Sequence, residues 1–122
     1  MELAPGLAHA FDFVVEGELL TDVGGALATP VLATPRMIAM MERCSVGAVR
    51  AAYPEGYASV GFEVCVKHVA GAVQGTTCTV RATLREVVDG RKLRFEVEVV
   101  EQERVIGTGT HERRLVSTDV TP

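Results

Sequence analysis

The chain has 122 residues, of which 48% are hydrophobic and 23% are charged, and its formal net charge is −4. This balance is typical of one folded globular domain, here over residues 1–122, and excludes a disordered chain. The acidic balance argues against nucleic acid as a partner, because binding to phosphates needs a surplus of Lys and Arg on one face.

The cysteines and the first residues of the chain indicate in which cellular compartment the protein is expected. Cys44, Cys65 and Cys78 are too few and too irregularly spaced for a disulfide framework or a metal site. The first six residues lack the basic and apolar regions of a signal peptide, and no run approaches the about 20 apolar residues of a membrane span. We therefore expect a cytoplasmic protein without a metal and without membrane contact.

The chain begins with a short strand and a loop. Residues 9–15, HAFDFVV, are rich in aromatic and branched side chains, which predicts a strand. Residues 16–33 include Gly24-Gly25 and Thr29-Pro30, so this segment is expected to be a loop or lid of low regular content.

The clearest element is a helix that begins at Thr34-Pro35 and ends before Pro54. Thr as N-cap followed by Pro at the first helical position is a helix start signal. Mostly apolar side chains recur at helical spacing and form one stripe, namely Met37, Met41, Cys44, Ala48 and Ala52. Arginines repeat every seven residues and predict a solvated stripe on another side, namely Arg36, Arg43 and Arg50.

After Gly56 the apolar residues recur with period two, which predicts consecutive strands. The alternating runs are 62–69, 77–85 and 93–99, and a last strand covers about 104–116. Asp89-Gly90 is a two-residue hairpin signal. In the first run, alternation predicts one helix-facing side made of Phe62, Val64, Val66 and His68.

One early strand, one long helix and four antiparallel strands predict an α+β domain. A curved antiparallel sheet wrapped around one long helix is the hotdog arrangement, with one apolar face on the helix and one solvated face. The open edge of such a sheet is commonly covered by pairing with a second copy. A homodimer is therefore expected, and a further step to a tetramer stays open.

Three polar side chains could carry chemistry, and each also has a structural explanation. His68 lies on an apolar face, where burial can tune an imidazole near neutral pH, although such a His is more often a core residue. Glu42 borders the apolar stripe of the helix, so it is either a partly desolvated base or a boundary residue paired with a basic strand residue. Thr34 is explained as N-cap, but its hydroxyl could also face a pocket near Glu42.

Glycines in two strand-like runs indicate close approaches of the backbone. Gly61 marks either a bulge or contact with a ligand. Gly107 and Gly109 indicate crowding against a neighbouring element or ligand. The residues that follow, His111, Arg113 and Arg114, predict a local cationic group that is either a solvated strand end or a phosphate contact.

These residues resemble the fluoroacetyl-CoA thioesterase family of the hotdog superfamily. There a Thr is followed eight residues later by a Glu, and that Glu 26 residues later by a His in a Val-x-His context; Thr34, Glu42 and Val66-Lys67-His68 have this spacing. Gly61 falls at the family's substrate-contacting Gly, and residues 109–113 match its GTHER segment. The resemblance covers about residues 31–116.

The resemblance implies an acyl-CoA thioesterase whose catalytic residues are Thr34, Glu42 and His68. Glu42 would activate water or attack the thioester carbonyl, and His68 would pass a proton to the leaving thiolate. The residues that it assigns to substrate binding are Gly61, Val69, His111 and Arg113. Coenzyme A is then part of the substrate, and neither a separate cofactor nor a metal is expected.

The lid before the helix departs from the family pattern. Family members carry Phe residues there, whereas residues 21–28 contain no aromatic side chain. We therefore expect a different short or medium acyl group, or looser specificity. Two alternatives stay open, a hotdog acyl-CoA hydratase or dehydratase, and a non-catalytic acyl-CoA binding module in which Glu42 and His68 form a structural pair.

Overall fold

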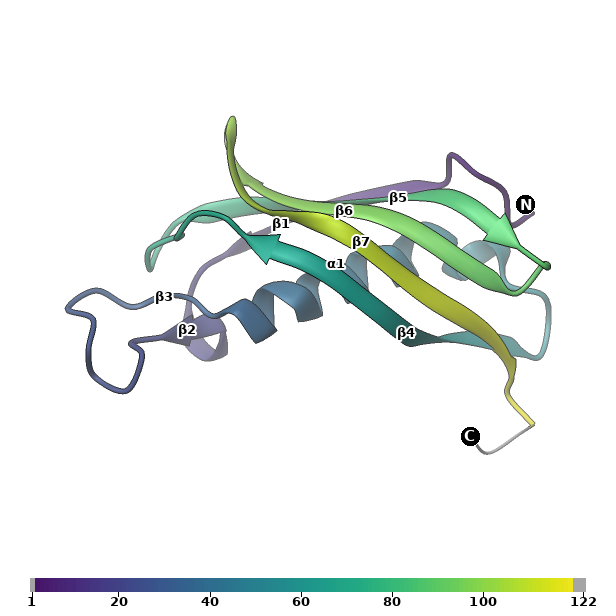
Figure 1. Ribbon diagram of the computed structural model, residues 1–122, viewed down its shortest axis with the longest axis horizontal. Helices are drawn as coiled ribbons and strands as arrows, with labels where there is room; N and C mark the ends of the chain where they lie inside the picture. Colours follow the sequence, from purple (N-terminus) through teal and green to yellow (C-terminus); the bar gives the residue numbers. More distant parts are fainter. Residues whose placement is uncertain (1, 120–122) are drawn as a thin grey trace.

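The computed structural model describes residues 2–119, in which one α-helix lies across one face of a curved antiparallel sheet (Figure 1). The sheet has five strands in the order β1-β5-β6-β7-β4, and a second sheet pairs β2 with β3. The elements in chain order are β1 (Ala8–Val14), η1 (Gly17–Leu19), β2 (Leu20–Thr21), β3 (Val31–Leu32), α1 (Thr34–Val49), η2 (Arg50–Ala52), β4 (Tyr57–His68), β5 (Thr77–Val88), β6 (Lys92–Glu101) and β7 (Arg104–Ser117).

The core lies between α1 and the two central strands next to it, β5 and β6. Alternate residues of these strands are buried against the helix, namely Cys78, Val80, Ala82, Leu84, Leu93, Phe95, Val97 and Val99. The helix contributes Met37, Met41, Cys44, Ala48 and Val49. This packing explains the period-two pattern of the strands, since only one face of the sheet is covered. No helix within residues 2–119 is long and apolar enough to cross a membrane.

The start of α1 differs from the prediction by one residue. Ala33 is the N-cap and makes no side-chain capping hydrogen bond, while Thr34 is already helical and Pro35 follows it. The Ala33 carbonyl accepts the N–H groups of Arg36 and Met37 at 3.1 and 2.9 Å. The prediction that Thr34 caps the helix is therefore wrong, and its hydroxyl remains available for another contact.

A bulge in β4 breaks the alternation that was predicted for this strand. The register between β4 and β7 shifts between Gly61 and Glu63, so Phe62 is the additional residue. Gly61 is placed opposite Arg113 on the helix side, and Val64 opposite His111. Phe62 is 58% exposed and turns to the outer face of the sheet, so its predicted place beside Val64 is wrong. A bulge sets two residues against one, which moves one side chain to the other face.

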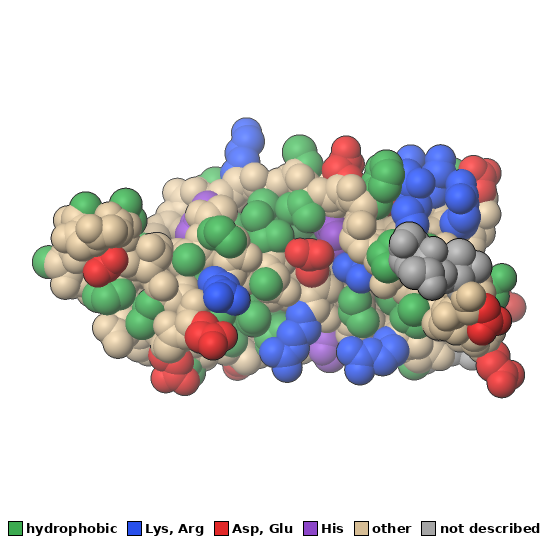
Figure 2. Space-filling view, turned by 90° about the horizontal axis from the view of Figure 1, so that it is seen from below, with side chains coloured by type: hydrophobic (Ala, Val, Ile, Leu, Met, Phe, Trp, Pro, Cys, Tyr) green, Lys and Arg blue, Asp and Glu red, His purple; other side chains and the backbone are tan. Residues whose placement is uncertain are grey.

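The edge strand β4 exposes large apolar side chains. Tyr57, Val60, Phe62 and Val64 are 46%, 41%, 58% and 38% exposed. Figure 2, which looks at the helix side of the molecule, shows apolar and charged side chains mixed over this face. An unpaired strand edge flanked by apolar groups favours association with another strand.

Candidate active site

Thr34 and His68 meet where the first turn of α1 lies beside the end of β4. The Thr34 Oγ1 and His68 Nδ1 atoms are 2.7 Å apart and form a hydrogen bond. The other ring nitrogen, Nε2, is buried and has no hydrogen-bond partner among residues 2–119. A buried polar atom without a partner is unusual in proteins and marks a position where a further group is expected.

An open depression of about 350 Å³ lies at this pair. It is lined by Thr34, His68, Val69, Ala70 and Gly71. Val69, which the family resemblance assigned to substrate binding, is 54% exposed there. The Thr34 hydroxyl and the imidazole therefore border a space that is open to solvent.

Glu42 lies two helical turns after Thr34 and faces Gly61 on β4. A Cβ atom built on Gly61 would be 3.1 Å from Glu42 Oε2, so the missing side chain leaves room for the carboxylate. The Glu42 side chain is 40% exposed, and its Oε2 is 3.8 Å from Arg113 Nη1. Gly61 thus acts both as part of a bulge and as a close neighbour of the carboxylate.

Arg113 is held in place from β4. Its Nε donates to Ser59 Oγ at 2.8 Å and its Nη2 donates to the Ser59 carbonyl at 2.9 Å. The Tyr53 hydroxyl in turn hydrogen-bonds to Ser59 Oγ. The Arg113 side chain is only 9% exposed, so a fixed guanidinium stands beside the Glu42 carboxylate. Sequence patterns gave no signal for Ser59 or Tyr53, because their role depends on the strand register.

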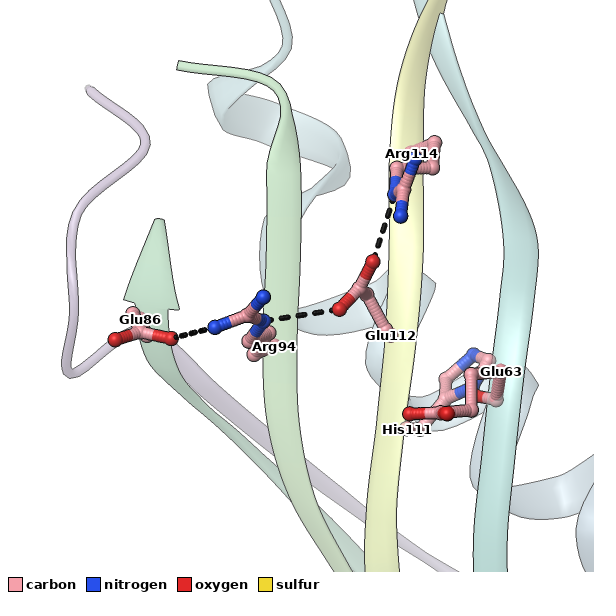
Figure 3. Close-up of polar contacts among 6 residues, drawn as sticks. All are labelled: Glu63, Glu86, Arg94, His111, Glu112 and Arg114. Atoms are coloured by element: carbon pink, nitrogen blue, oxygen red, sulfur yellow. Dashed lines mark hydrogen bonds and ion pairs between the residues drawn. The ribbon is translucent and has the colours of Figure 1, made fainter. Parts of the chain in front are cut away.

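His111 is buried beside Arg113, and its contacts define its protonation. Its Nδ1 is 2.8 Å from the Glu63 carbonyl oxygen, which can only accept, so Nδ1 carries the proton (Figure 3 shows both residues on neighbouring strands). Its Nε2 then accepts from Arg113 Nη1 at 3.3 Å. Burial lowers the pKa of His111, and the charge of Arg113 lowers it further. His111 is therefore a neutral support for Arg113.

The cationic group predicted at the end of the chain does not form, because β7 alternates between the two faces. Arg113 faces the helix, whereas Arg114 lies on the outer face, where Glu112 accepts from Arg114 at 2.7 Å and from Arg94 at 2.9 Å. Arg94 also donates to Glu86 at 2.6 Å, which completes the row in Figure 3. The two arginines lower the pKa of Glu112.

Within one chain, Glu42 and His68 belong to two separate clusters. Glu42 is about 12 Å farther along the helix axis than Thr34, from a rise of about 1.5 Å per residue. Gly61 and His68 are about 23 Å apart along β4, from a rise of about 3.3 Å per residue. No hydrogen bond or ion pair joins Glu42 to His68 in the described chain. The predicted meeting of carboxylate and imidazole in one cavity is therefore not found inside a single chain.

Comparisons with known proteins identify relatives of this chain. The family described as "Fluoroacetyl-CoA-specific thioesterase" matches residues 15–119. The fluoroacetyl-CoA thioesterase of Streptantibioticus cattleyicolor is 40% identical over 86 residues, which cover 70% of this chain and 61% of that relative. The match thus spans less than two thirds of the relative's length.

Two solved structures have the same architecture. One is a Phe-to-Ala variant of the fluoroacetyl-CoA-specific thioesterase FlK in complex with fluoroacetate and CoA, with a TM-score of 0.84, 33% identity, and coverage of 96% of this chain and 98% of that chain. The other is a hot-dog-like protein from Thermanaerovibrio acidaminovorans, with a TM-score of 0.85, 27% identity, and coverage of 94% and 84%. The hotdog fold and the family predicted from the sequence are confirmed, and the chain belongs to the fluoroacetyl-CoA-specific thioesterase family.

Proposed function

We propose that this chain hydrolyses a short or medium acyl-CoA thioester to the free acid and CoA. The observation that carries the proposal is the Thr34–His68 hydrogen bond with its buried and unpartnered Nε2. A proton-transfer group of this kind suits a reaction in which a thiolate leaves. The family membership and the thioesterases among the relatives support the same reaction class.

The proposed chemistry is acyl transfer to water. The Glu42 carboxylate activates a water molecule or attacks the carbonyl carbon itself, and the bond between that carbon and the CoA sulfur breaks. His68 passes a proton to the departing thiolate, and Thr34 holds the imidazole in place. In the second route, water then hydrolyses the acyl-enzyme anhydride. Both routes require the Glu42 carboxylate and the His68 imidazole to contact the same substrate molecule.

A homodimer would bring these two groups together. If β4 pairs antiparallel with its own copy about a two-fold axis at Cys65, Gly61 and Phe62 of one chain lie opposite His68 of the partner subunit. The carboxylate beside Gly61 then shares a cavity with the partner subunit's Thr34 and His68. The separation of the clusters within one chain and the exposed apolar side chains of β4 support this arrangement.

The same register is favoured by the side chains that it would juxtapose. Residues directly opposite in an antiparallel pair point to the same face, and opposite charges there are stabilising. An axis at Cys65 sets Glu63 opposite Lys67 twice, on the outer face, and Val64 opposite Val66 twice, on the helix face. With Gly61 and Phe62 again counted as one position because of the bulge, an axis at Val64 sets Glu63 opposite Cys65 and Lys67 opposite Val60, so neither charge has a partner.

The cytoplasm is the compartment that we propose for this enzyme. Cys44, Cys65 and Cys78 are all free thiols, and Cys65 is exposed. Free exposed thiols persist in a reducing compartment, which supports this proposal.

The test is release of free CoA from a panel of saturated acyl-CoAs and fluoroacetyl-CoA, followed with a thiol dye. We expect hydrolysis of short or medium chains, and a loss of about 10²- to 10⁴-fold in kcat for Glu42→Gln. The matched control is Glu55→Gln at an exposed site outside both clusters. Water addition to an enoyl-CoA without thiol release would identify a hydratase, and binding without turnover would identify a binding module; either result contradicts the proposal.

A further inference from the structure

The arginines of the sheet are matched by carboxylates, whereas those of the helix are not. On the outer face Arg81 pairs with Glu98 at 3.1 Å and Arg85 with Glu96 at 2.8 Å. Arg94, Arg104, Arg113 and Arg114 also have acidic partners. Within residues 2–119, no carboxylate lies within 4.0 Å of the helix arginines, namely Arg36, Arg43 and Arg50.

The unpaired arginines form a row that follows α1 through Arg36 and Arg43 and ends at Arg50, the first residue of η2. Residues seven apart on a helix lie on nearly the same side, about 10 Å apart along its axis. All three side chains are exposed, so they contribute little to the core. Figure 2 shows basic side chains in a row on the helix side of the molecule. In a chain of net charge −4, this row is a local surplus of positive charge.

A groove of about 650 Å³ opens beside this row, between the second half of α1 and β1. Arg43 and Arg50 line one side, and the rings of His9 and Phe11 line the other. The two rings are 6.1 Å apart and tilted by 48°, and the Arg43 guanidinium carbon lies 5.2 Å from the Phe11 centroid. Asp12 also borders the groove and accepts a hydrogen bond from Thr79 at 2.7 Å.

Gly47 allows the floor of the groove to form. A Cβ atom at this helix position would lie 2.5 Å from Cδ2 of His9, so any side chain would displace the ring. Glycine inside a helix disfavours the helical state, since its unfolded chain has the most freedom to lose. The helix α1 thus carries the unfavourable residue Gly47 at the position where the His9 imidazole lies against it.

Two guanidiniums without carboxylate partners and two rings in one groove suit a ligand with phosphates and a flat base. Guanidinium groups bind phosphate oxygens in pairs, and bases stack on aromatic rings or on guanidinium planes. The volume is within the range of small-molecule sites. The phosphate contact that the sequence suggested for the end of β7 has no comparable basis, because Arg113 and Arg114 are already paired.

We propose that this groove binds a phosphorylated adenosine. The nucleotide end of the CoA substrate and a free nucleotide carry the same chemistry, and the experiment separates these two sources. Binding of the nucleotide end of CoA rests on the proposed thioesterase function, whereas binding of a free nucleotide in the groove does not.

The binding test is calorimetric titration with adenosine 3′,5′-bisphosphate at low and moderate salt. We expect wild-type protein to bind, Arg43→Gln/Arg50→Gln to bind at least tenfold more weakly, and Phe11→Leu to lose affinity for the bisphosphate but not for pyrophosphate. The control is Arg81→Gln/Arg85→Gln, which removes two paired cations from the other face. Absence of binding to the wild type, or equal losses in both double variants, overturns the proposal.

The source is identified by comparing an acyl-CoA with the same acyl group on pantetheine, which lacks the nucleotide. If the groove holds the substrate, the helix double variant raises KM for acyl-CoA at least tenfold and leaves KM for acyl-pantetheine unchanged. If KM is unchanged for both while bisphosphate binding is lost, the groove is a separate nucleotide site. A wild type that cleaves neither substrate refutes the proposed function, and the calorimetric titration still shows whether the groove binds a nucleotide.

Discussion

The Thr34 hydroxyl and the His68 imidazole are joined by a 2.7 Å hydrogen bond that links the first residue of α1 to the last residue of β4. Because Ala33 is the N-cap, the hydroxyl is not needed to start the helix. The bond occupies Nδ1, and in the mechanism proposed above Nε2 is the nitrogen that exchanges a proton with the substrate. The placement of Thr34 is therefore better explained by chemistry than by helix capping.

Replacing Thr34 separates these two roles. Thr34→Ala should lower kcat by roughly 10- to 100-fold, since a hydrogen bond to a group that becomes charged contributes about 1.5–3 kcal/mol. Its free energy of unfolding should change by less than about 0.5 kcal/mol, as at ordinary surface positions. Thr34→Ser should restore most of the rate. Full activity with a stability loss of about 1 kcal/mol would instead indicate a capping role.

Gly61→Ala should act through Glu42. The added methyl group would lie 3.1 Å from Glu42 Oε2, so the carboxylate has to turn away. We expect kcat to fall about tenfold or more, which corresponds to about 1.4 kcal/mol in the barrier. A double-mutant cycle with Glu42→Gln checks the cause, because Gly61→Ala should cost nothing further once the carboxylate is gone. Additive losses would show that Gly61 acts independently of Glu42.

The sequence was sufficient for the layout of the fold. Period-two patterns located β5 and β6 because one face of each strand is buried on α1 and the other faces solvent. The Thr34-Pro35 pair located the helix start to within one residue. Gly107 and Gly109 were expected to mark crowding, and a Cβ on them would lie 2.4 Å from Met37 Sδ and 2.2 Å from the Cys65 carbonyl oxygen.

The candidate site was harder to predict from the sequence, because it depends on strand register and on a bulge. One additional residue at Phe62 moves Gly61 and Val64 onto the same face, which strict alternation cannot produce. Adjacency in sequence placed Arg113 with Arg114, although neighbouring strand residues point to opposite faces. Ser59 reaches Arg113 only through the pairing of β4 with β7, a contact between residues 54 positions apart.

His111 should make stability depend on pH. Its pKa is lowered below the ordinary value of 6.5, so the unfolded chain binds this proton at a higher pH than the folded chain does. The neutral His111 is fully compatible with the fold above pH 6.5, and stability should fall as the pH drops from there toward the lowered pKa. Urea unfolding at several pH values between 7.5 and 5 measures this slope.

The matched variant is His111→Asn, which keeps a donor near the Glu63 carbonyl and does not titrate. Its stability should change less than that of the wild type between pH 7.5 and 5, whatever its absolute stability. The other two histidines are present in both proteins and cancel in the comparison. An unchanged slope would mean that His111 does not couple protonation to folding.

The proposed dimer register pairs Glu63 with Lys67 of the partner subunit, so a charge reversal should weaken it. Lys67→Glu sets like charges opposite each other twice and should raise the dimer dissociation constant, with about 0.2–1 kcal/mol lost per pair plus repulsion. The double variant Glu63→Lys/Lys67→Glu restores both pairs and should recover the dimer. Analytical ultracentrifugation measures both, and a double variant weaker than Lys67→Glu alone would contradict the register.

Cys65 gives a direct test of the two-fold axis. Residues directly opposite in an antiparallel pair have Cα atoms about 4.5–5.5 Å apart, which is within the range of a disulfide. Mild oxidation should therefore produce a covalent dimer that Cys65→Ser abolishes. Cys44 and Cys78 are buried, and burial raises the pKa of Cys44 to about 11, so neither thiol should compete. Because the link would form in the active arrangement, the oxidised dimer should keep its thioesterase activity. A dimer in solution that does not cross-link would exclude an axis at Cys65, and a monomer with full activity would exclude a site shared between two chains.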